Sequence, residues 1–383
     1  MEVAKRLIDI GEYYFSQKLR EIDKLNKAGK NIINLGIGSP DLPPHPDVIN
    51  TLREESVKPD VHGYQSYKGS IVLRKAMSGW YKKWYNVELN PDNEILPLIG
   101  SKEGIMHICM TYLNEGDQVL VPNLGYPTYR SAVKMAGGIC IDYDLKEVNN
   151  YTPDFVVLEA VDLSKVRLMF VNYPQMPTGQ PANKKLFEQL VAFGKKTGIL
   201  IIHDNPYSFI LNEYPMSLLS IDGAKDCVLE LNSLSKSQNM AGWRVGMLSG
   251  AKERIEEVLR FKSNMDSGMY LPLQLAAATA LNLGKEWYDT LNSIYRERRK
   301  KVFELLDLLN CEYSKDQVGM FVWAKIPAKR KTGYELSDEI LYNSNVFITP
   351  GGIFGNTGDG HIRVSLCASI ERFEEAIKRI SQK

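Results

Sequence analysis

The chain of 383 residues contains little cysteine, no long apolar run and almost no net charge. Its cysteines are far apart, with no Cys-X-X-Cys pair and no Cys/His spacing typical of zinc, so we expect reduced thiols and no metal site. No stretch approaches the ~18 apolar residues of a membrane helix, and the first residues, MEVAKRLIDIGEYYF, lack the apolar core of a signal peptide. These absences predict a cytoplasmic protein without a membrane span.

The charges are nearly balanced. Lys and Arg total 47 and Asp and Glu total 46, which leaves a net charge of +1. This balance gives no electrostatic signature of a nucleic-acid or membrane partner, so a function has to be argued from a site. The length and the 44% hydrophobic content predict a large core divided between two domains.

Short β-rich runs alternate with helical patterns from about residue 94 onward. The predicted strands are EILPLI (94–99), DQVLVP (117–122), ICIDYD (139–144), VRLMFVNYP (166–174), ILIIHDN (199–205), CVLELNSLS (227–235) and RVGMLSG (244–250). Nearly continuous apolar strands separated by helices indicate a mostly parallel sheet flanked by helices on both faces, which is the α/β class. We predict a large domain over 45–285.

The rest of the chain predicts a smaller α+β domain made of residues 1–44 with 286–383. Its predicted strands are FVWAKIP (321–327), VFITPG (346–351) and HIRVSL (361–366), with helical patterns at 334–344 and 369–381. No flexible linker separates the two parts, so we expect long helices to join them.

Polar residues follow the ends of the predicted strands, where α/β proteins bind their ligands. Gly100 and Ser101 open a helix whose N-terminal N–H groups suit a phosphate, and Ser233 and Arg244 can complete the same cup. Asp204 ends an apolar strand, where a carboxylate needs a cationic partner such as a protonated ring nitrogen.

The lysine of SLSK, Lys236, completes this set. A lysine able to form a Schiff base, an acid for a pyridine nitrogen, an aromatic for ring stacking and a phosphate cup together describe a site for pyridoxal 5′-phosphate.

Six motifs in order give the chain a resemblance to the class I/II aminotransferases, which are fold-type I pyridoxal-phosphate enzymes. The motifs are LGIGSPDLPP (35–44), GYQSYKGSIVLRKAM (63–77), NYPQMPTG (172–179), HDNPYSFI (203–210), SLSKSQNMAGWRVG (233–246) and HIRVSL (361–366). The resemblance covers almost the whole chain.

The resemblance implies a role for each matching residue. Lys236 is the Schiff-base lysine and the proton-transfer group, Asp204 holds the pyridine nitrogen protonated, and Tyr207 donates to the ring's phenolic oxygen. The remaining implied cofactor-binding residues are Gly100, Ser101, Lys102, Tyr126, Asn172, Ser233 and Arg244. Structural alternatives exist: a surface lysine for Lys236, a strand-end cap for Asp204, and packing for Tyr207, Tyr126 and Tyr64.

Two further positions are implied in substrate binding, and one in assembly. Arg363 matches the arginine that grips the substrate α-carboxylate, with Gly38 offering a backbone N–H to the same group. Tyr64 matches the tyrosine that reaches the phosphate of the neighbouring subunit, which implies a homodimer with shared sites. Side-chain selection is expected from the N-terminal segment around Tyr13 to Phe15, from Ile37, and from the SNMDSGM loop (263–269) contributed by the neighbouring subunit.

The expected activity is transfer of an amino group between an L-amino acid and a 2-oxo acid by a ping-pong mechanism. A carbon–sulfur β-lyase on the same scaffold is the alternative, because the motifs describe the cofactor and the carboxylate and not the later fate of the substrate. A ligand-sensing regulator would need a DNA-binding domain, for which the residues before Leu35 leave no room. Met176 replaces the family's usual asparagine and cannot donate a hydrogen bond, so an inactive relative stays open as well.

Overall fold

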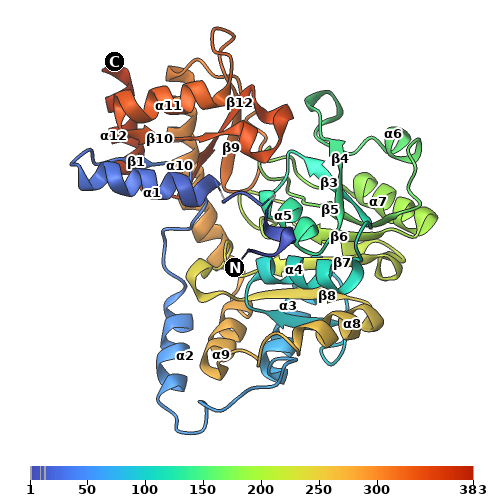
Figure 1. Ribbon diagram of the computed structural model, residues 1–383. Coiled ribbons are helices and arrows are strands. Elements are labelled where there is room, and N and C mark those ends of the chain that lie inside the picture. Colours follow the sequence, from blue (N-terminus) through green and yellow to red (C-terminus); the bar gives the residue numbers. More distant parts are fainter. Residues whose placement is uncertain (1, 9, 13, 383) are drawn as a thin grey trace.

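A seven-stranded sheet forms the centre of the protein, in the order β2-β8-β7-β6-β5-β3-β4 (Figure 1). The computed structural model describes residues 2–8, 10–12 and 14–382. β8 runs antiparallel to β2 and β7, and the other strands all point in one direction. The strands are β2 (Ile95–Leu98), β3 (Gln118–Asn123), β4 (Ile139–Asp144), β5 (Val166–Val171), β6 (Leu200–Asp204), β7 (Val228–Ser233) and β8 (Gly246–Gly250). The predicted mostly parallel sheet is confirmed.

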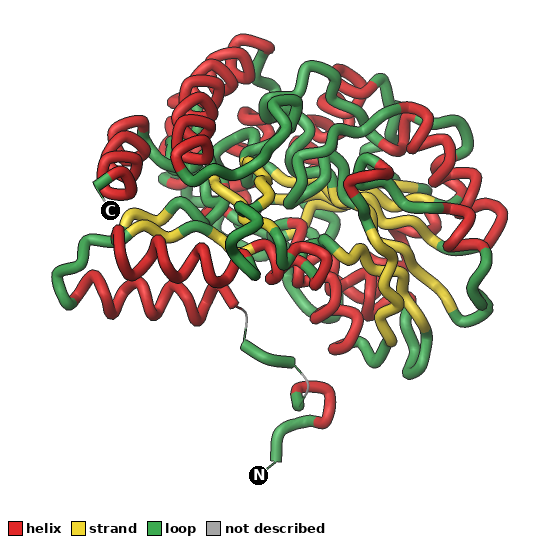
Figure 2. Tube along the Cα trace, turned by 90° about the horizontal axis from the view of Figure 1, so that it is seen from above, coloured by secondary structure: helices red, strands yellow, loops and turns green. Residues whose placement is uncertain are grey.

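Both faces of this sheet are buried under helices (Figure 2). In β5, Leu168 and Phe170 belong to one apolar cluster, whereas Met169 and Val171 belong to the other. The first cluster includes apolar side chains of α4 (Ser101–Tyr112), α5 (Pro127–Met135) and α8 (Lys252–Lys262). The second includes α3 (Ile71–Tyr85), α7 (Lys184–Thr197) and α9 (Leu271–Leu281). Because successive side chains of a strand point to opposite faces, a strand covered on both sides is apolar along its covered length, which in β5 is residues 168–171.

Two smaller sheets lie beside the large one. β9 (Phe321–Lys325), β11 (Thr349–Pro350) and β12 (His361–Ser365) form an antiparallel sheet, and β1 (Ile33–Asn34) pairs with β10 (Val346–Phe347). The strand predicted at 346–351 is therefore split, because the chain changes its pairing partner at Ile348. The helices of this part are α1 (Tyr14–Lys27), α10 (Lys285–Leu308), α11 (Gly333–Ser344) and α12 (Ile370–Ser381).

Pairing of β1 with β10 brings the N-terminal segment next to the C-terminal part of the chain, on the side of the molecule that also holds α11 and α12 (Figure 1). The remaining helices are α2 (Pro46–Ser56) and α6 (Phe155–Glu159). The boundaries of the two domains, 45–285 against 1–44 with 286–383, stay a prediction. In the described part of the chain, no helix combines the length and the apolar character needed to cross a bilayer.

Candidate active site

A cavity of about 490 Å³ lies beside the carboxyl ends of β6 and β7. It brings together most of the residues singled out from the sequence, although they are spread along the chain from position 38 to position 363. Those that line it are Gly38, Ser101, Lys102, Tyr126, Asn172, Asp204, Tyr207, Ser233, Lys236, Arg244 and Arg363. The carboxyl ends of strands in an open α/β sheet are the usual place for a ligand.

Lys236 lies in the loop that follows β7 and lines this cavity, so it is not a solvated surface lysine. Its Nζ donates to the carbonyl oxygen of Gly38 at 2.6 Å and lies 6.0 Å from the centre of the Tyr207 ring. Burial lowers the pKa of the Lys236 ammonium to about 8, and the charges of Arg363 and Arg244 act in the same direction. A lysine with this pKa is partly neutral near pH 8 and can act as a nucleophile or a base.

Asp204 is the last residue of β6, and its side chain is buried. Its Oδ2 accepts a hydrogen bond from the Tyr129 hydroxyl at 2.7 Å, whereas its Oδ1 has no hydrogen-bond partner among the described residues. Burial raises the pKa of the Asp204 carboxyl to about 6, although the Tyr129 hydrogen bond opposes the rise. A buried carboxylate oxygen without a partner needs an N–H donor, and the pyridine nitrogen of pyridoxal phosphate fits this requirement when protonated.

The predicted phosphate cup is assembled around the start of α4. Gly100 is the N-cap residue with φ +83°, and a Cβ at this position would lie 2.1 Å from Nη2 of Arg244. Only glycine permits this backbone conformation and such a close approach of the guanidinium. Ser233 Oγ donates to Ser235 Oγ at 2.9 Å, and Arg244 Nη1 donates to the same Ser235 Oγ at 3.4 Å, so the serines before Lys236 reach the same corner. Helix N–H groups, hydroxyls and a guanidinium at one place suit a phosphate.

Arg363 of β12 is buried and enclosed by aromatic rings. Its guanidinium carbon lies 3.8 Å from the centre of the Phe321 ring and 4.6 Å from that of Phe354. Nη2 donates to the carbonyl oxygen of Gly36 at 2.8 Å. A planar guanidinium held between rings at the wall of a cavity is well oriented to bind a carboxylate with two hydrogen bonds.

Met176 contacts Arg363 in this structure, since Nη1 of Arg363 lies 3.2 Å from the thioether sulfur. Gln175 does not replace the missing amide donor, because it is not among the residues that line the cavity and its Nε2 donates to the Leu124 carbonyl oxygen at 2.7 Å. Asn172 shapes the loop, because its side chain donates to the Asp204 carbonyl oxygen and accepts from the Met176 N–H. Tyr207 is therefore the remaining predicted donor for the phenolic oxygen of the cofactor.

Tyr64 lies apart from the other predicted residues. Its side chain is 94% exposed and does not line the cavity, which excludes the alternative of a core tyrosine. Tyr126 precedes α5 and lines the cavity, with its ring 5.7 Å from that of Tyr129. Tyr13 lies outside the described residues, whereas Phe15 and Ile37 do line the cavity.

Sequence reasoning missed Tyr129 and the aromatic cage of Arg363. Tyr129 follows Tyr126 by one helical turn, and this spacing on α5 is the signal that would have placed both rings on one face. Phe321 and Phe354 carry no comparable local signal, since their motifs resemble ordinary core segments.

Comparisons with known proteins agree with this geometry. Residues 30–380 match the family described as Aminotransferase class I and II. An LL-diaminopimelate aminotransferase from Dehalococcoides mccartyi is 38% identical, and the match covers 100% of this chain and 98% of that protein. One from Aquifex aeolicus is 36% identical, with 99% of this chain and 98% of the relative covered.

Solved structures give the same result. BacF from Bacillus subtilis superimposes with a TM-score of 0.95 at 37% identity, over 100% of this chain and 98% of that one. The aromatic aminotransferase from Pyrococcus horikoshii gives a TM-score of 0.87 at 28% identity, over 95% and 98% of the two chains. These relatives lend no support to the β-lyase alternative.

The fold-type I architecture, a cavity that fits the cofactor and a family match along nearly the whole chain lead to one conclusion. The protein belongs to the class I and II aminotransferases and is a pyridoxal-phosphate-dependent enzyme that transfers an amino group between an amino acid and a 2-oxo acid.

Proposed function

We propose that Lys236, Asp204 and Arg363 each have a separate role in this transfer. When bound, pyridoxal phosphate supplies an electron sink for the bond that breaks at the substrate α-carbon. Asp204 Oδ1, which is buried and has no hydrogen-bond partner in the part of the chain that the structure describes, keeps the ring nitrogen protonated, and this single observation is the main support for the proposal. Arg363 grips the α-carboxylate, and Lys236 Nζ accepts the proton that leaves the α-carbon.

The other cavity residues hold the cofactor in this proposal. Gly100, Ser101, Ser233 and Arg244 bind the phosphate, with Lys102 beside them on the first turn of α4. Tyr126 stacks on the ring, and Tyr207 donates to its phenolic oxygen. Support comes from their positions on the lining of one cavity and, for Gly100, from its contact with Arg244.

LL-diaminopimelate is the first amino donor that we propose, because the name of the full-length relatives specifies it. A second candidate is an amino acid with an apolar side chain. The described residues that line the cavity include Phe15, Leu19, Ile37 and Phe354, and Asp204 is their only acidic side chain. The second ammonium group of LL-diaminopimelate would therefore need a negatively charged partner from outside the described cavity lining.

A donor panel separates these candidates. Purified enzyme is mixed with LL-diaminopimelate, phenylalanine, leucine or glutamate, and loss of the cofactor absorption band is followed during the first half-reaction. Formation of the amino product from 2-oxoglutarate follows the second half-reaction. No change of the band with any L-amino acid would contradict the proposed roles.

Replacing Arg363 by alanine should raise KM about 10- to 100-fold for every amino donor, because the α-carboxylate is common to all of them. Cofactor content, measured from the absorption band, should stay unchanged. Arg363→Lys is the matched control, since it keeps the charge but loses the planar fork, and it should recover only part of the affinity. An unaltered KM in the alanine variant would remove Arg363 from the substrate site.

A homodimer with shared sites is our proposal for the assembly, and a cytoplasmic location stays a prediction from the sequence. Exposed apolar side chains gather on two loops: Tyr64 (94% exposed) and Tyr67 (47%) on one, and Met265 (50%) and Tyr270 (40%) on the other. The loops touch, because a Cβ on Gly268 would lie 2.8 Å from the carbonyl oxygens of residues 65 and 66. A second copy covering this patch would bury it and place Tyr64 near the neighbouring phosphate cup.

Mixing two impaired variants tests the shared sites. Tyr64→Ala should lose about tenfold or more of the activity through the lost phosphate contact, and Lys236→Ala should lose all of it. After subunit exchange at equal amounts, half of the dimers are hybrids with one intact site each, so about one quarter of the wild-type activity should return. No recovery after exchange has been verified by mass would argue that each chain builds its site alone.

A further inference from the structure

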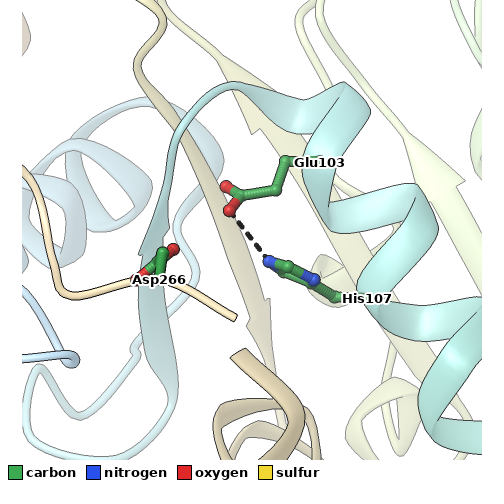
Figure 3. A group of neighbouring side chains, drawn as sticks. All are labelled: Glu103, His107 and Asp266. Carbon is green, nitrogen blue, oxygen red and sulfur yellow. Dashed lines mark ion pairs between the residues drawn. The ribbon is translucent and has the colours of Figure 1, made fainter. Parts of the chain in front are cut away.

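A group of ionisable side chains lies beside α4 and consists of Glu103, His107 and Asp266 (Figure 3). One ligand-type atom of each residue lies within 4.8 Å of those of the others, as a metal site would require. However, the ammonium of Lys262 lies 2.6 Å from Asp266 Oδ1 and 2.5 Å from Oδ2. A metal would have to displace this ammonium, so we propose no metal site there.

A different contact joins the end of β3 to the loop that carries Phe354. This loop, residues 354–357, lies between β11 and β12, and we call it the Phe354 loop. Asn123 is the last residue of β3, and its Nδ2 donates to Asn356 Oδ1 at 2.7 Å. The carbonyl oxygen of Asn123 accepts from Thr357 Oγ1 at 3.1 Å. These hydrogen bonds hold the Phe354 loop on the end of the central sheet.

The backbone just after β3 has a conformation that costs free energy. Leu124 has φ +108°, which is rare for a residue with a side chain. Such a conformation persists only where the surrounding contacts hold it. Here Gln175 Nε2 donates to the Leu124 carbonyl oxygen at 2.7 Å, and the backbone N–H of Gly125 donates to the Phe354 carbonyl oxygen at 2.8 Å. The contact between the two segments is therefore supported from both sides of the strained residue.

Gly355 permits the close approach of the two segments. Its φ is +146°, and a Cβ at this position would lie 2.2 Å from Asn123 Oδ1 and 2.9 Å from the backbone nitrogen of Leu124. A larger residue would therefore push the Phe354 loop away from β3. Gly360 lies in the same connection between β11 and β12, and a Cβ there would meet no described atom within 4 Å. It provides a matched control position.

The Phe354 ring lies where the substrate carboxylate is expected to bind. It lines the cavity, and its centre is 4.6 Å from the guanidinium carbon of Arg363. A ring against the guanidinium restricts its rotation and excludes water from one of its faces. Both effects strengthen a charge-assisted pair with a carboxylate. The Phe354 loop can therefore affect carboxylate binding through Arg363.

We propose that Asn123 and Gly355 are positioning residues for substrate binding. They hold the Phe354 ring against Arg363, so that the guanidinium keeps the orientation in which it binds the α-carboxylate. The inference rests on the proposed role of Arg363. It predicts that loosening the contact weakens the binding of ligands that carry a carboxylate and leaves other ligands unaffected.

The test compares Gly355→Ala with Gly360→Ala in the full-length holoenzyme. The first half-reaction is followed in single turnovers from the cofactor absorption band, with phenylalanine and with 2-phenylethylamine, which lacks the carboxylate. In Gly355→Ala the dissociation constant for phenylalanine should rise about tenfold, whereas the maximal rate should change by less than about threefold. The constant for 2-phenylethylamine should stay within about twofold of the wild type, because this amine has no carboxylate for Arg363 to bind. Gly360→Ala should match the wild type with both ligands.

A milder variant keeps the inference testable if Gly355→Ala does not fold. Thr357 is exposed, and Thr357→Val removes only the hydroxyl that donates to the Asn123 carbonyl oxygen. Its dissociation constant for phenylalanine should rise about threefold, and Thr357→Ser, which keeps the hydroxyl, should bind phenylalanine as the wild type does. Amide hydrogen exchange in residues 354–357 should be faster in Thr357→Val than in Thr357→Ser, and this measurement does not depend on activity.

Equal losses for phenylalanine and 2-phenylethylamine would overturn the inference, because the contact would then be purely structural. An unchanged phenylalanine constant in Gly355→Ala would overturn it as well. In the double variant with Arg363→Ala the two losses should not add, because both act through the same guanidinium. Failure of the proposed function would look different, since Arg363→Ala by itself would then leave phenylalanine binding unchanged.

Discussion

Replacing Lys236 by alanine is expected to abolish transamination, with a loss of about 10⁴-fold or more in kcat, because the amine serves as both nucleophile and base. Borohydride reduction of the wild-type enzyme should remove the cofactor absorption band and fix the cofactor on one peptide. Mass mapping should place the label on Lys236.

Lys102→Ala is the matched control, because Lys102 is a second lysine on the wall of the same cavity. This variant should keep the reducible absorption band, whereas Lys236→Ala should lose it. A label on any lysine other than Lys236 would overturn the assignment of the site.

Replacing Asp204 by asparagine is expected to lower kcat by about 10³-fold, because the amide cannot supply the negative charge that keeps the ring nitrogen protonated. Asparagine is similar in shape and can still accept from the Tyr129 hydroxyl, so the change isolates the charge. Steady-state kinetics with the best donor, at measured cofactor content, give the effect.

Tyr129→Phe is the control for this variant, since it removes only the 2.7 Å hydrogen bond to Asp204. Because that hydrogen bond lowers the pKa of the Asp204 carboxyl, the Tyr129→Phe variant should raise this pKa above its value of about 6. Activity should fall only modestly. An Asp204→Asn variant within tenfold of the wild type would contradict the proposed role of Asp204.

The sequence was sufficient to predict the sheet and many of the residues that line the cavity. Residues 168–171 of β5 are apolar at every position, and this pattern has few solutions other than burial on both faces of a sheet. Polar residues directly after such strands must then meet at one edge, which is why the sequence predicts that Asp204, Ser233 and Lys236 lie together.

Contacts between distant segments were beyond the reach of local patterns. Tyr129 lies 75 residues from Asp204, and Met176 lies 187 residues from Arg363, yet each pair is in contact. Two further features likewise depend on how separate loops approach one another. Among the described residues Oδ1 of Asp204 has no hydrogen-bond partner, and a Cβ on Gly100 would lie 2.1 Å from Nη2 of Arg244.

Sequence alone determined the class of fold, the cofactor and the order of the motifs, because hydrophobic periodicity and residue chemistry act over a few neighbouring positions. Only the tertiary structure decided which distant side chains are paired by hydrogen bonds, ion pairs or ring contacts. The packing of α4 against α8 brings Asp266 and Lys262 to Glu103 and His107, and the packing of β12 beside β9 places Arg363 against Phe321. Such pairings depend on close packing between elements, which no periodicity within one segment encodes.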